Sequence, residues 1–292
     1  MKLSYCLQKG DKEFKEGNRW LNSIVHGGCV EILNSISPES FDLTVTSPPH
    51  SLREECPEFN AETIASALYR VMKPGGVIVW TVSDPIVGGS RTGDSFLQAL
   101  TFKELGFLLH DTMIFQDERL TPFFEKTFDR YSSVFEFMFV FSKGRPKTAK
   151  LLCDKKNRWL GETNWGQSTK RLRDGQLVKR PDIKPIKKYS PRTNLWEYDV
   201  PRGIVEEVRP GIFPEQLAID HILTWSNRND VVVDPLCGTG TTCIAAARLG
   251  RKYFGIDIDD KSCETARRRL NEFHSNWGNR YRWHRYGIKR TW

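Results

Sequence analysis

Residues 231–257 constrain the fold more than any other part of the sequence. Three consecutive valines end in Asp234, a glycine-containing turn and a helix pattern of small residues follow, and a second apolar strand pattern ends in Asp257. A strand, a glycine turn that opens a helix, and a second strand ending in an acid are typical of a βαβ unit with parallel strands. The sequence therefore predicts an α/β protein with a mostly parallel, doubly wound sheet.

The turn inside this unit has the composition of a ligand-binding loop. Gly238 and Gly240 allow the backbone to approach a ligand closely, and Asp257 is placed to accept hydrogen bonds from two ribose hydroxyls. Cys243 stands where a dinucleotide site has its third glycine, and the lysine of a P-loop is missing. The loop favours a nucleoside site, with a tight structural turn as the alternative.

Strand and helix patterns alternate along most of the chain, and "KPGG" ends the second helix. Strands are expected at 41–45, 77–82, 108–116, 132–143, 230–234 and 252–259, and helices at 29–35, 62–72, 95–106, 214–226, 241–250 and 261–273. Between about 144 and 210 the pattern lapses into a stretch rich in Lys, Arg, Pro, Gly and Asn. We expect an irregular insertion there, since its tryptophans argue against a plain linker.

The positive charge of the chain is concentrated. The net charge is +8, and residues 143–192 hold sixteen Lys and Arg against four Asp and Glu. The C-terminal residues 274–292 interleave arginine with Trp and Tyr. This mixture suits phosphate contacts and base stacking. We therefore favour binding of nucleic acid over the alternative of a merely solvated basic surface.

Other classes of protein are not indicated. The seven cysteines are scattered without a C-x-x-C pair, and the six histidines form no ligand pattern, so we expect no metal. No apolar run approaches the ~18 residues of a membrane span, and residues 1–20 lack the apolar segment of a signal peptide. A soluble, cytoplasmic protein is expected.

The second unusual loop is "SPPH", Ser47-Pro48-Pro49-His50, directly after the strand pattern at 41–45. Two prolines in succession donate no N–H and fix both φ angles, which leaves a stiff row of carbonyl acceptors. A rigid turn alone would explain it equally well. If strands 41–45 and 231–234 are neighbours, however, this loop and the glycine loop face one crevice at the carboxyl edge of the sheet.

These two loops resemble a known family, the permuted beta class of S-adenosylmethionine-dependent DNA amino-methyltransferases. That class has [D/N/S]-P-P-[aromatic] ahead of D-P-F-x-G-[S/T]-G-T, and this chain has Ser47–His50 ahead of Asp234–Thr241. Further matches are "MKPGG", "FVFSKG", "NLWEYD", "FPEQL" and "GIDID", so the resemblance covers most of the chain. It implies a Rossmann-like methyltransferase fold and S-adenosylmethionine as cofactor.

The resemblance also implies roles for particular residues. The catalytic residues would be Ser47, Pro48, Pro49 and His50. The cofactor-binding residues would be Thr46, Asp234, Pro235, Leu236, Cys237, Gly238, Gly240, Thr241, Asp257, Phe213 and Asn194. Two positions depart from the pattern: Gly28 stands where many members have an acid that contacts the cofactor adenine, and His50 replaces Tyr or Phe.

Serine ahead of the two prolines goes mainly with methylation of cytosine N4 in that family. Adenine N6 is the alternative, and a DNA-binding protein that keeps the fold without turnover is a further one. The target nucleotide would flip out of duplex DNA, and His50 would stack on it. A cognate restriction endonuclease is an expected functional partner.

Three parts of the chain follow from this hypothesis. Residues 1–143 would be the catalytic half of the methyltransferase domain, and residues 211–292 the cofactor-binding half with a basic aromatic tail. Residues 144–210 would be a target-recognition insertion. The residues expected to contact DNA are Arg91, Lys170, Arg171 and Arg173.

Overall fold

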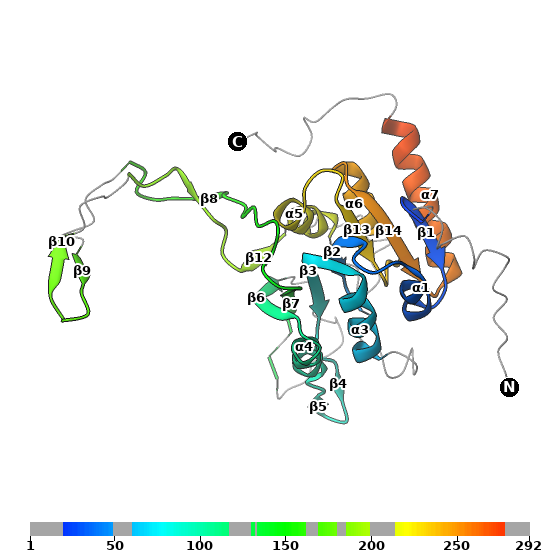
Figure 1. The fold of residues 1–292 in the computed structure, drawn as a ribbon, viewed down its shortest axis with the longest axis horizontal. Helices are drawn as coiled ribbons and strands as arrows, with labels where there is room; N and C mark the ends of the chain where they lie inside the picture. Colours follow the sequence, from blue (N-terminus) through cyan, green and yellow to red (C-terminus); the bar gives the residue numbers. More distant parts are fainter. Residues whose placement is uncertain are drawn as a thin grey trace. The chain divides into compact units, whose positions relative to one another are not determined.

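A computed structural model describes residues 20–48, 60–116, 130–131, 133–161, 169–179, 185–198 and 214–277 of the chain (Figure 1). The chain divides into two compact units. The first, called here the main unit, combines Met1–Ala149 with Leu195–Trp292; the second, the insertion unit, is Lys150–Asn194.

The main unit is built around an eight-stranded sheet, in the order β1-β14-β13-β2-β3-β7-β6-β12. Strand β7 runs antiparallel to both of its neighbours, and the other pairs are parallel. The bounds are β1 Ser23–His26, β2 Phe41–Thr46, β3 Met72–Val82, β6 Leu108–Gln116, β7 Phe135–Ser142, β12 Leu195–Glu197, β13 Val231–Asp234 and β14 Lys252–Asp257.

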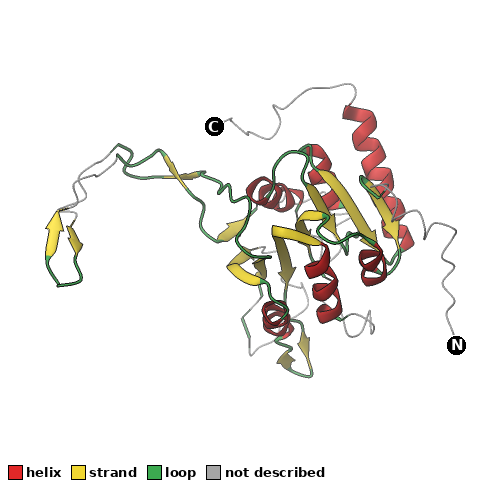
Figure 2. Cartoon of the chain, viewed as in Figure 1, coloured by secondary structure: helices red, strands yellow, loops and turns green. Residues whose placement is uncertain are grey.

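Helices cover both faces of this sheet (Figures 1 and 2). One group packs together as α1 (Cys29–Ser35), α3 (Ala61–Val71) and α4 (Asp94–Glu104), and the other as α5 (Glu215–Trp225), α6 (Thr241–Arg248) and α7 (Asp260–Trp277). The core on the side of α1, α3 and α4 is aromatic: Phe102 stacks on Phe141 at 4.5 Å and also contacts Trp80. The expected mostly parallel, doubly wound architecture is confirmed.

The strand order reverses between β2 and β13. From β2 the chain proceeds to β3 on one side, and from β13 to β14 on the other, while β2 and β13 pair with each other in parallel. Ligands of open α/β sheets bind at the carboxyl edge at such a reversal. The two strands are therefore adjacent, which is the condition under which both exit loops face one crevice.

Several elements differ from the sequence-based expectation. Strand β3 begins at Met72, directly after α3, so "KPGG" lies within the strand, where Gly75 has a φ of +78°. Strands β1 and β12 were not expected, because four and three residues are too few to show a periodic pattern. Helix α7 continues to Trp277, beyond the expected end at residue 273.

The glycine-rich loop after β3 forms a small hairpin. Its strands are β4 (Ile86–Val87) and β5 (Ser90–Arg91), and they pair in antiparallel fashion. The side chain of Arg91 is exposed, and its Nη1 donates to the carbonyl of Asp84 at 2.8 Å.

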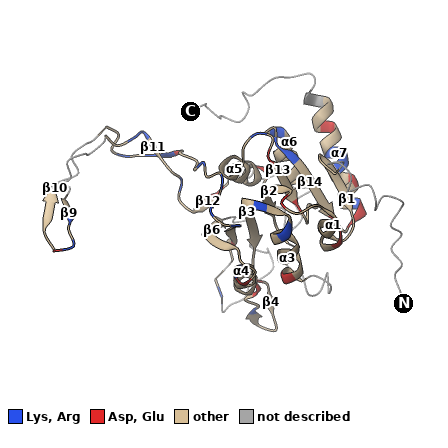
Figure 3. Ribbon diagram, in the orientation of Figure 1, with Lys and Arg blue, Asp and Glu red and all other residues tan. Residues whose placement is uncertain are grey.

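The insertion unit is more regular than expected, because it contains two antiparallel strand pairs. They are β8 (Lys155–Lys156) with β11 (Tyr189–Ser190), and β9 (Thr169–Arg171) with β10 (Leu177–Lys179). Figure 3 shows Lys and Arg at several places along this unit. Residues 144–149 and β12, which the sequence placed in the insertion, belong to the main unit.

Within the described ranges, no helix is both long enough and apolar enough to cross a membrane. The described residues also include no group of His, Cys, Asp and Glu that could hold a metal ion.

Candidate active site

Two side-chain hydrogen bonds join the exit of β2 to the glycine loop after β13. Thr46 Oγ1 donates to Asp234 Oδ1 at 2.7 Å, and Thr242 Oγ1, in the first turn of α6, donates to the carbonyl of Val45 at 3.0 Å. Both bonds lie in the buried interior, where a hydrogen bond is strengthened by the low dielectric. The Ser47-Pro48 segment is thus fixed relative to the glycine loop before any ligand binds.

Asp234 is the centre of this connection. Its Oδ1 also accepts from the Leu236 N–H at 3.2 Å. Burial raises the pKa of Asp234 to about 6, although the hydrogen bonds from Thr46 and Leu236 act in the opposite direction. Thr46 is fully buried and donates its hydroxyl to this carboxyl group, so the structure shows both residues bracing the loop.

The glycine loop follows as Pro235, Leu236, Cys237, Gly238, Thr239 and Gly240, and α6 begins at Thr241. Gly240 has a φ of +83°, and a Cβ there would lie 2.8 Å from the Cβ of Ala266, so only glycine fits. Gly238 has a φ of +50° and open space where a Cβ would be. The Cys237 N–H donates to the Ile256 carbonyl at 2.8 Å, and burial raises the pKa of the Cys237 thiol well above its usual range.

Asp257 ends β14 beside this loop. Its Oδ2 accepts from the Gly238 N–H at 2.7 Å and its Oδ1 from the Asp259 N–H at 2.9 Å. Burial raises the pKa of Asp257 above its ordinary value, and the two N–H donors oppose that shift. Each carboxylate oxygen keeps lone pairs for further donors, and Gly238 borders open space, so the residues present fit a ribose with two hydroxyls.

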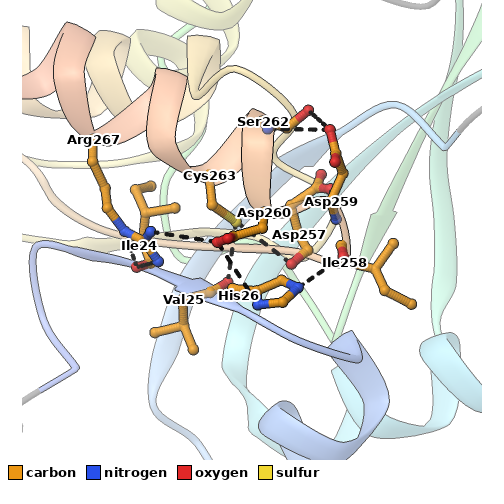
Figure 4. Close-up of polar contacts among 10 residues, drawn as sticks. All are labelled: Ile24, Val25, His26, Asp257, Ile258, Asp259, Asp260, Ser262, Cys263 and Arg267. Carbon is orange, nitrogen blue, oxygen red and sulfur yellow. Dashed lines mark hydrogen bonds and ion pairs between the residues drawn. The ribbon is translucent and has the colours of Figure 1, made fainter. Parts of the chain in front are cut away.

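The end of β1 supports Asp257 from the other side (Figure 4). His26 is the register partner of Asp257, its Nε2 lies 3.0 Å from the Ile258 carbonyl, and its Nδ1 lies 3.8 Å from Asp260 Oδ1. Asp259 caps α7 by accepting from the Ser262 N–H at 3.1 Å.

Gly28, where the family often has an acid, is the N-cap of α1, and nothing lies within 4 Å of the position of a Cβ. Residue 28 therefore contributes no side chain to this edge, where His26, Asp257 and Asp260 lie. Sequence reasoning missed His26, since β1 is too short to be read as a strand.

Arg269 is a second residue that sequence reasoning missed. From α7 its Nη1 donates to the Thr239 carbonyl at 2.7 Å and to Thr239 Oγ1 at 2.9 Å, so it holds the glycine loop. Nothing in the run Arg267-Arg268-Arg269 indicates which arginine contacts the glycine loop.

Ser47 stands at the beginning of the predicted catalytic segment. Its hydroxyl oxygen is buried and has no hydrogen-bond partner among the described residues, and Pro48 is buried beside it. A buried hydroxyl without a partner is costly, and such groups gather at functional sites. Pro49, His50 and Phe213 lie outside the described residues.

The residues predicted to contact DNA or the cofactor edge lie apart from this centre in the chain. Arg171 and Arg173 belong to the β9–β10 hairpin and its turn, where both side chains are exposed. Lys170 lies in β9, and its side chain is outside the description. Asn194 is an exposed residue at the end of the insertion unit.

Comparison with known proteins agrees with this arrangement. The family model described as DNA methylase, of the N6/N4 type, matches residues 41–268. The orphan methyltransferase M.BamHII of Bacillus amyloliquefaciens is 46% identical over 243 residues, which cover 80% of this chain and 90% of that protein. The type II methyltransferase M.HinfI of Haemophilus influenzae is 26% identical over 292 residues, which cover 89% of this chain and 71% of that protein.

Solved structures show the same fold. The cytosine-N4-specific PvuII DNA methyltransferase matches with a TM-score of 0.60 and 18% identity, covering 87% of this chain and 91% of that chain. The complex of M1.HpyAVI with SAM matches with a TM-score of 0.58 and 21% identity, covering 85% and 98%. The expected Rossmann-like methyltransferase fold is thus confirmed.

Proposed function

We propose that this chain, which belongs to the DNA methylase family of the N6/N4 type, methylates the exocyclic N4 of cytosine in duplex DNA. The cofactor of this family is S-adenosylmethionine, whose sulfonium supplies an electrophilic methyl group when it is bound. Asp257 would bind its ribose hydroxyls, and the loop of Gly238 and Gly240 would lie along the rest of the nucleoside.

Ser47 is the observation that supports cytosine rather than adenine as the substrate. Serine stands where adenine-N6 enzymes mainly have Asp or Asn, and its hydroxyl is buried without a described partner. A ligand group that hydrogen-bonds Ser47 Oγ would relieve that cost.

Ser47 and Pro48 have a defined chemical task in this proposal. An exocyclic amine is a poor nucleophile because its lone pair is delocalised into the ring. The Ser47 hydroxyl and the Pro48 carbonyl would accept its two N–H groups and favour a pyramidal nitrogen whose lone pair is free. The bonds from Thr46 to Asp234 and from Thr242 to Val45 fix that geometry in advance, so it needs no reorganisation during the reaction.

No strong general base is required. The methylated amine becomes acidic once it has formed, and it can lose a proton to water or to Ser47. A buried target amine has to leave the base stack, and unstacking costs a few kcal/mol. His50, for which we propose stacking on the flipped base, follows directly in the chain.

The insertion is the proposed target-recognition region. Arg171 and Arg173 are exposed on a hairpin of a unit that has its own strand pairs, and we propose that they and Lys170 contact phosphates. Arg91 on the β4–β5 hairpin is a further proposed phosphate contact. A functionally linked restriction endonuclease stays a prediction.

Nucleoside mass spectrometry of DNA treated with the protein and S-adenosylmethionine tests the proposal. N4-methylcytosine is expected after digestion. Detection of N6-methyladenine would identify adenine rather than cytosine as the substrate. The absence of both methylated nucleosides would indicate a DNA-binding protein without turnover.

A further inference from the structure

Thr81, in β3, has a buried hydroxyl and lies outside both motif loops. The residue is fully buried, and its Oγ1 has no hydrogen-bond partner among the described residues. An unsatisfied buried hydroxyl destabilises a protein, and valine would fill the same space without that cost. The question is what the hydroxyl contributes at this position.

The neighbours of Thr81 show which face of the sheet it occupies. Trp80 points toward α4, since its Nε1 donates to Gln98 at 2.7 Å. Side chains alternate along a strand, so Thr81 points to the opposite face. Its register partner on β7 is Met138, whose Sδ lies 3.3 Å from Nε2 of His221 in α5. Thr81 therefore lies on the face that α5 covers.

Thr81 is also level with Ser47. The last register pair of β2 and β3 is Thr46 with Trp80, so the next residues along the chain are Ser47, just after the end of β2, and Thr81 in β3. Neighbouring strands are about 4.8 Å apart. Two buried hydroxyls without described partners, one just after β2 and one in the adjacent β3, thus lie at the carboxyl edge beside the loop that would bind the cofactor.

Burial without a partner does not by itself define a site. Ser142 in β7 has the same property, but it pairs with Val77, five residues before the carboxyl end of β3. The position of Thr81 beside Ser47 is what distinguishes the two.

We propose that Thr81 is a further residue that contacts the target base. A hydroxyl offers one donor and two acceptor lone pairs. The reacting edge of cytosine presents the N4 amine and, next to it, the ring nitrogen N3, which is an acceptor. With Ser47 and Pro48 on the amine, the Thr81 hydroxyl donates to that ring nitrogen.

This inference rests on the proposed transfer to an amine, but not on the identity of the base. Adenine has the same arrangement, with the ring nitrogen N1 beside the N6 amine. A finding of N6-methyladenine would therefore change the substrate and leave the role of Thr81 intact.

The first test compares Thr81→Val and Thr81→Ser in single-turnover methyl transfer to DNA that contains the identified target site. Thr81→Val should slow transfer about ten-fold, and Thr81→Ser, which keeps the hydroxyl, should stay within about three-fold of the wild type. Affinity for S-adenosylmethionine, measured by calorimetry, should not change. If valine does not fold in this position, Thr81→Ala supplies the same comparison.

A base analogue separates a direct contact from a structural effect. DNA with 3-deazacytosine at the target replaces the ring nitrogen by C–H; 1-deazaadenine serves if the target is adenine. The analogue should lower the rate of the wild-type protein relative to the natural base. The same change of base should not lower the rate of Thr81→Val by that factor. An equal factor in both proteins would overturn the inference, as would a Thr81→Val variant with the wild-type rate.

Ser142→Ala is the matched control, because it removes another buried hydroxyl without a described partner from the neighbouring strand. Both Ser142→Ala and Thr81→Val should keep or raise the melting temperature, and only Thr81→Val should slow transfer. A wild-type protein that methylates nothing would overturn the proposed function and this inference together.

Discussion

The main unit and the insertion unit are stabilised in different ways. The described core of the main unit consists largely of aromatic and aliphatic side chains on both faces of a large sheet, with stacked rings such as Phe102 and Phe141 on one face. The described part of the insertion unit has two short strand pairs and an exposed ion pair between Arg192 and Asp154. Exposed ion pairs contribute little to stability, typically 0–1 kcal/mol.

This difference matters for function. Hydrophobic packing fixes positions to within tenths of an ångström, as the reacting groups of an enzyme require. A charged surface that grips phosphates needs less accurate placement, because Coulomb attraction falls slowly with distance. We therefore expect mutations in the main unit to change chemistry and cofactor binding, and mutations in the insertion unit to change the salt dependence of DNA binding.

The largest effect should come from Ser47→Ala. Removing one preorganised group that contacts the reacting atoms typically slows an enzyme about 100-fold or more. Since Ser47 Oγ has no described partner, the fold should lose no stability. Single-turnover methyl transfer and a thermal melt check both statements, and a normal rate in this variant would contradict the role of Ser47.

Asp234→Asn should change how the stability of the main unit depends on pH. The pKa of Asp234 is raised to about 6 in the folded protein, so between pH 4 and pH 6 the folded state binds more protons than the unfolded state. Its contribution to stability is complete below pH 4 and is lost as pH rises through 6. A pKa difference of about two units corresponds to about 3 kcal/mol.

Asparagine carries no charge and can still accept the Thr46 hydroxyl and the Leu236 N–H at its Oδ1. The stability of Asp234→Asn relative to the wild type should therefore rise by up to about 3 kcal/mol from pH 4 to pH 7. Urea unfolding at several pH values measures this difference. Parallel curves for the two proteins would show that Asp234 does not titrate in this range.

Asp257→Ala should weaken cofactor binding by about ten-fold or more. Hydrogen bonds to a charged group contribute about 1.5–3 kcal/mol, and about 1.4 kcal/mol corresponds to one factor of ten. Asp260→Ala is the control, since it removes an exposed carboxylate at the same edge of the sheet. Calorimetric titration with S-adenosylmethionine should separate the two variants, and equal affinities would argue against ribose binding by Asp257.

The sequence predicted the sheet of the main unit because its elements are periodic and long. The helix at 62–72 appears as α3, one residue earlier at each end, and the strand at 77–82 is the carboxyl-terminal part of β3. The pairing of β2 with β13 was a condition of the two-loop hypothesis rather than a prediction, since a common ligand would need both exits on one edge, and the structure meets that condition. Strands β1 and β12 were not predicted from the sequence, because elements this short depend on tertiary pairing rather than on local pattern.

The candidate site was predicted less completely than the sheet. Motif positions such as Ser47, Gly240 and Asp257 were identified, because their residue types are constrained by chemistry or by φ. The bond from Thr46 to Asp234 could not be predicted, since it joins residues 188 positions apart. Thr81 was not identified from the sequence for another reason. In sequence it is an ordinary strand threonine, and only its position beside Ser47 makes it unusual.

Substitutions in the insertion unit should have the smallest effect per residue. Lys170, Arg171 and Arg173 lie together in the β9–β10 hairpin and its turn. If each contacts one phosphate, replacing all three by alanine should reduce the slope of log affinity against log salt by about 2.7, from about 0.9 per contact. DNA affinity should fall several-fold near 0.15 M salt, and cofactor affinity should not change.

A control with the same change of net charge makes this test specific to the hairpin. Lys103, Lys252 and Arg268 are exposed in the main unit, and their replacement by alanine also removes three positive charges. If the hairpin contacts the DNA backbone, the first triple variant should show the reduced slope and the second should bind like the wild type. An equally reduced slope in both variants would mean that only the overall charge matters. The phosphate contacts would then have to be sought elsewhere, first at Arg91 on the β4–β5 hairpin, because its exposed side chain belongs to the main unit and not to the insertion unit.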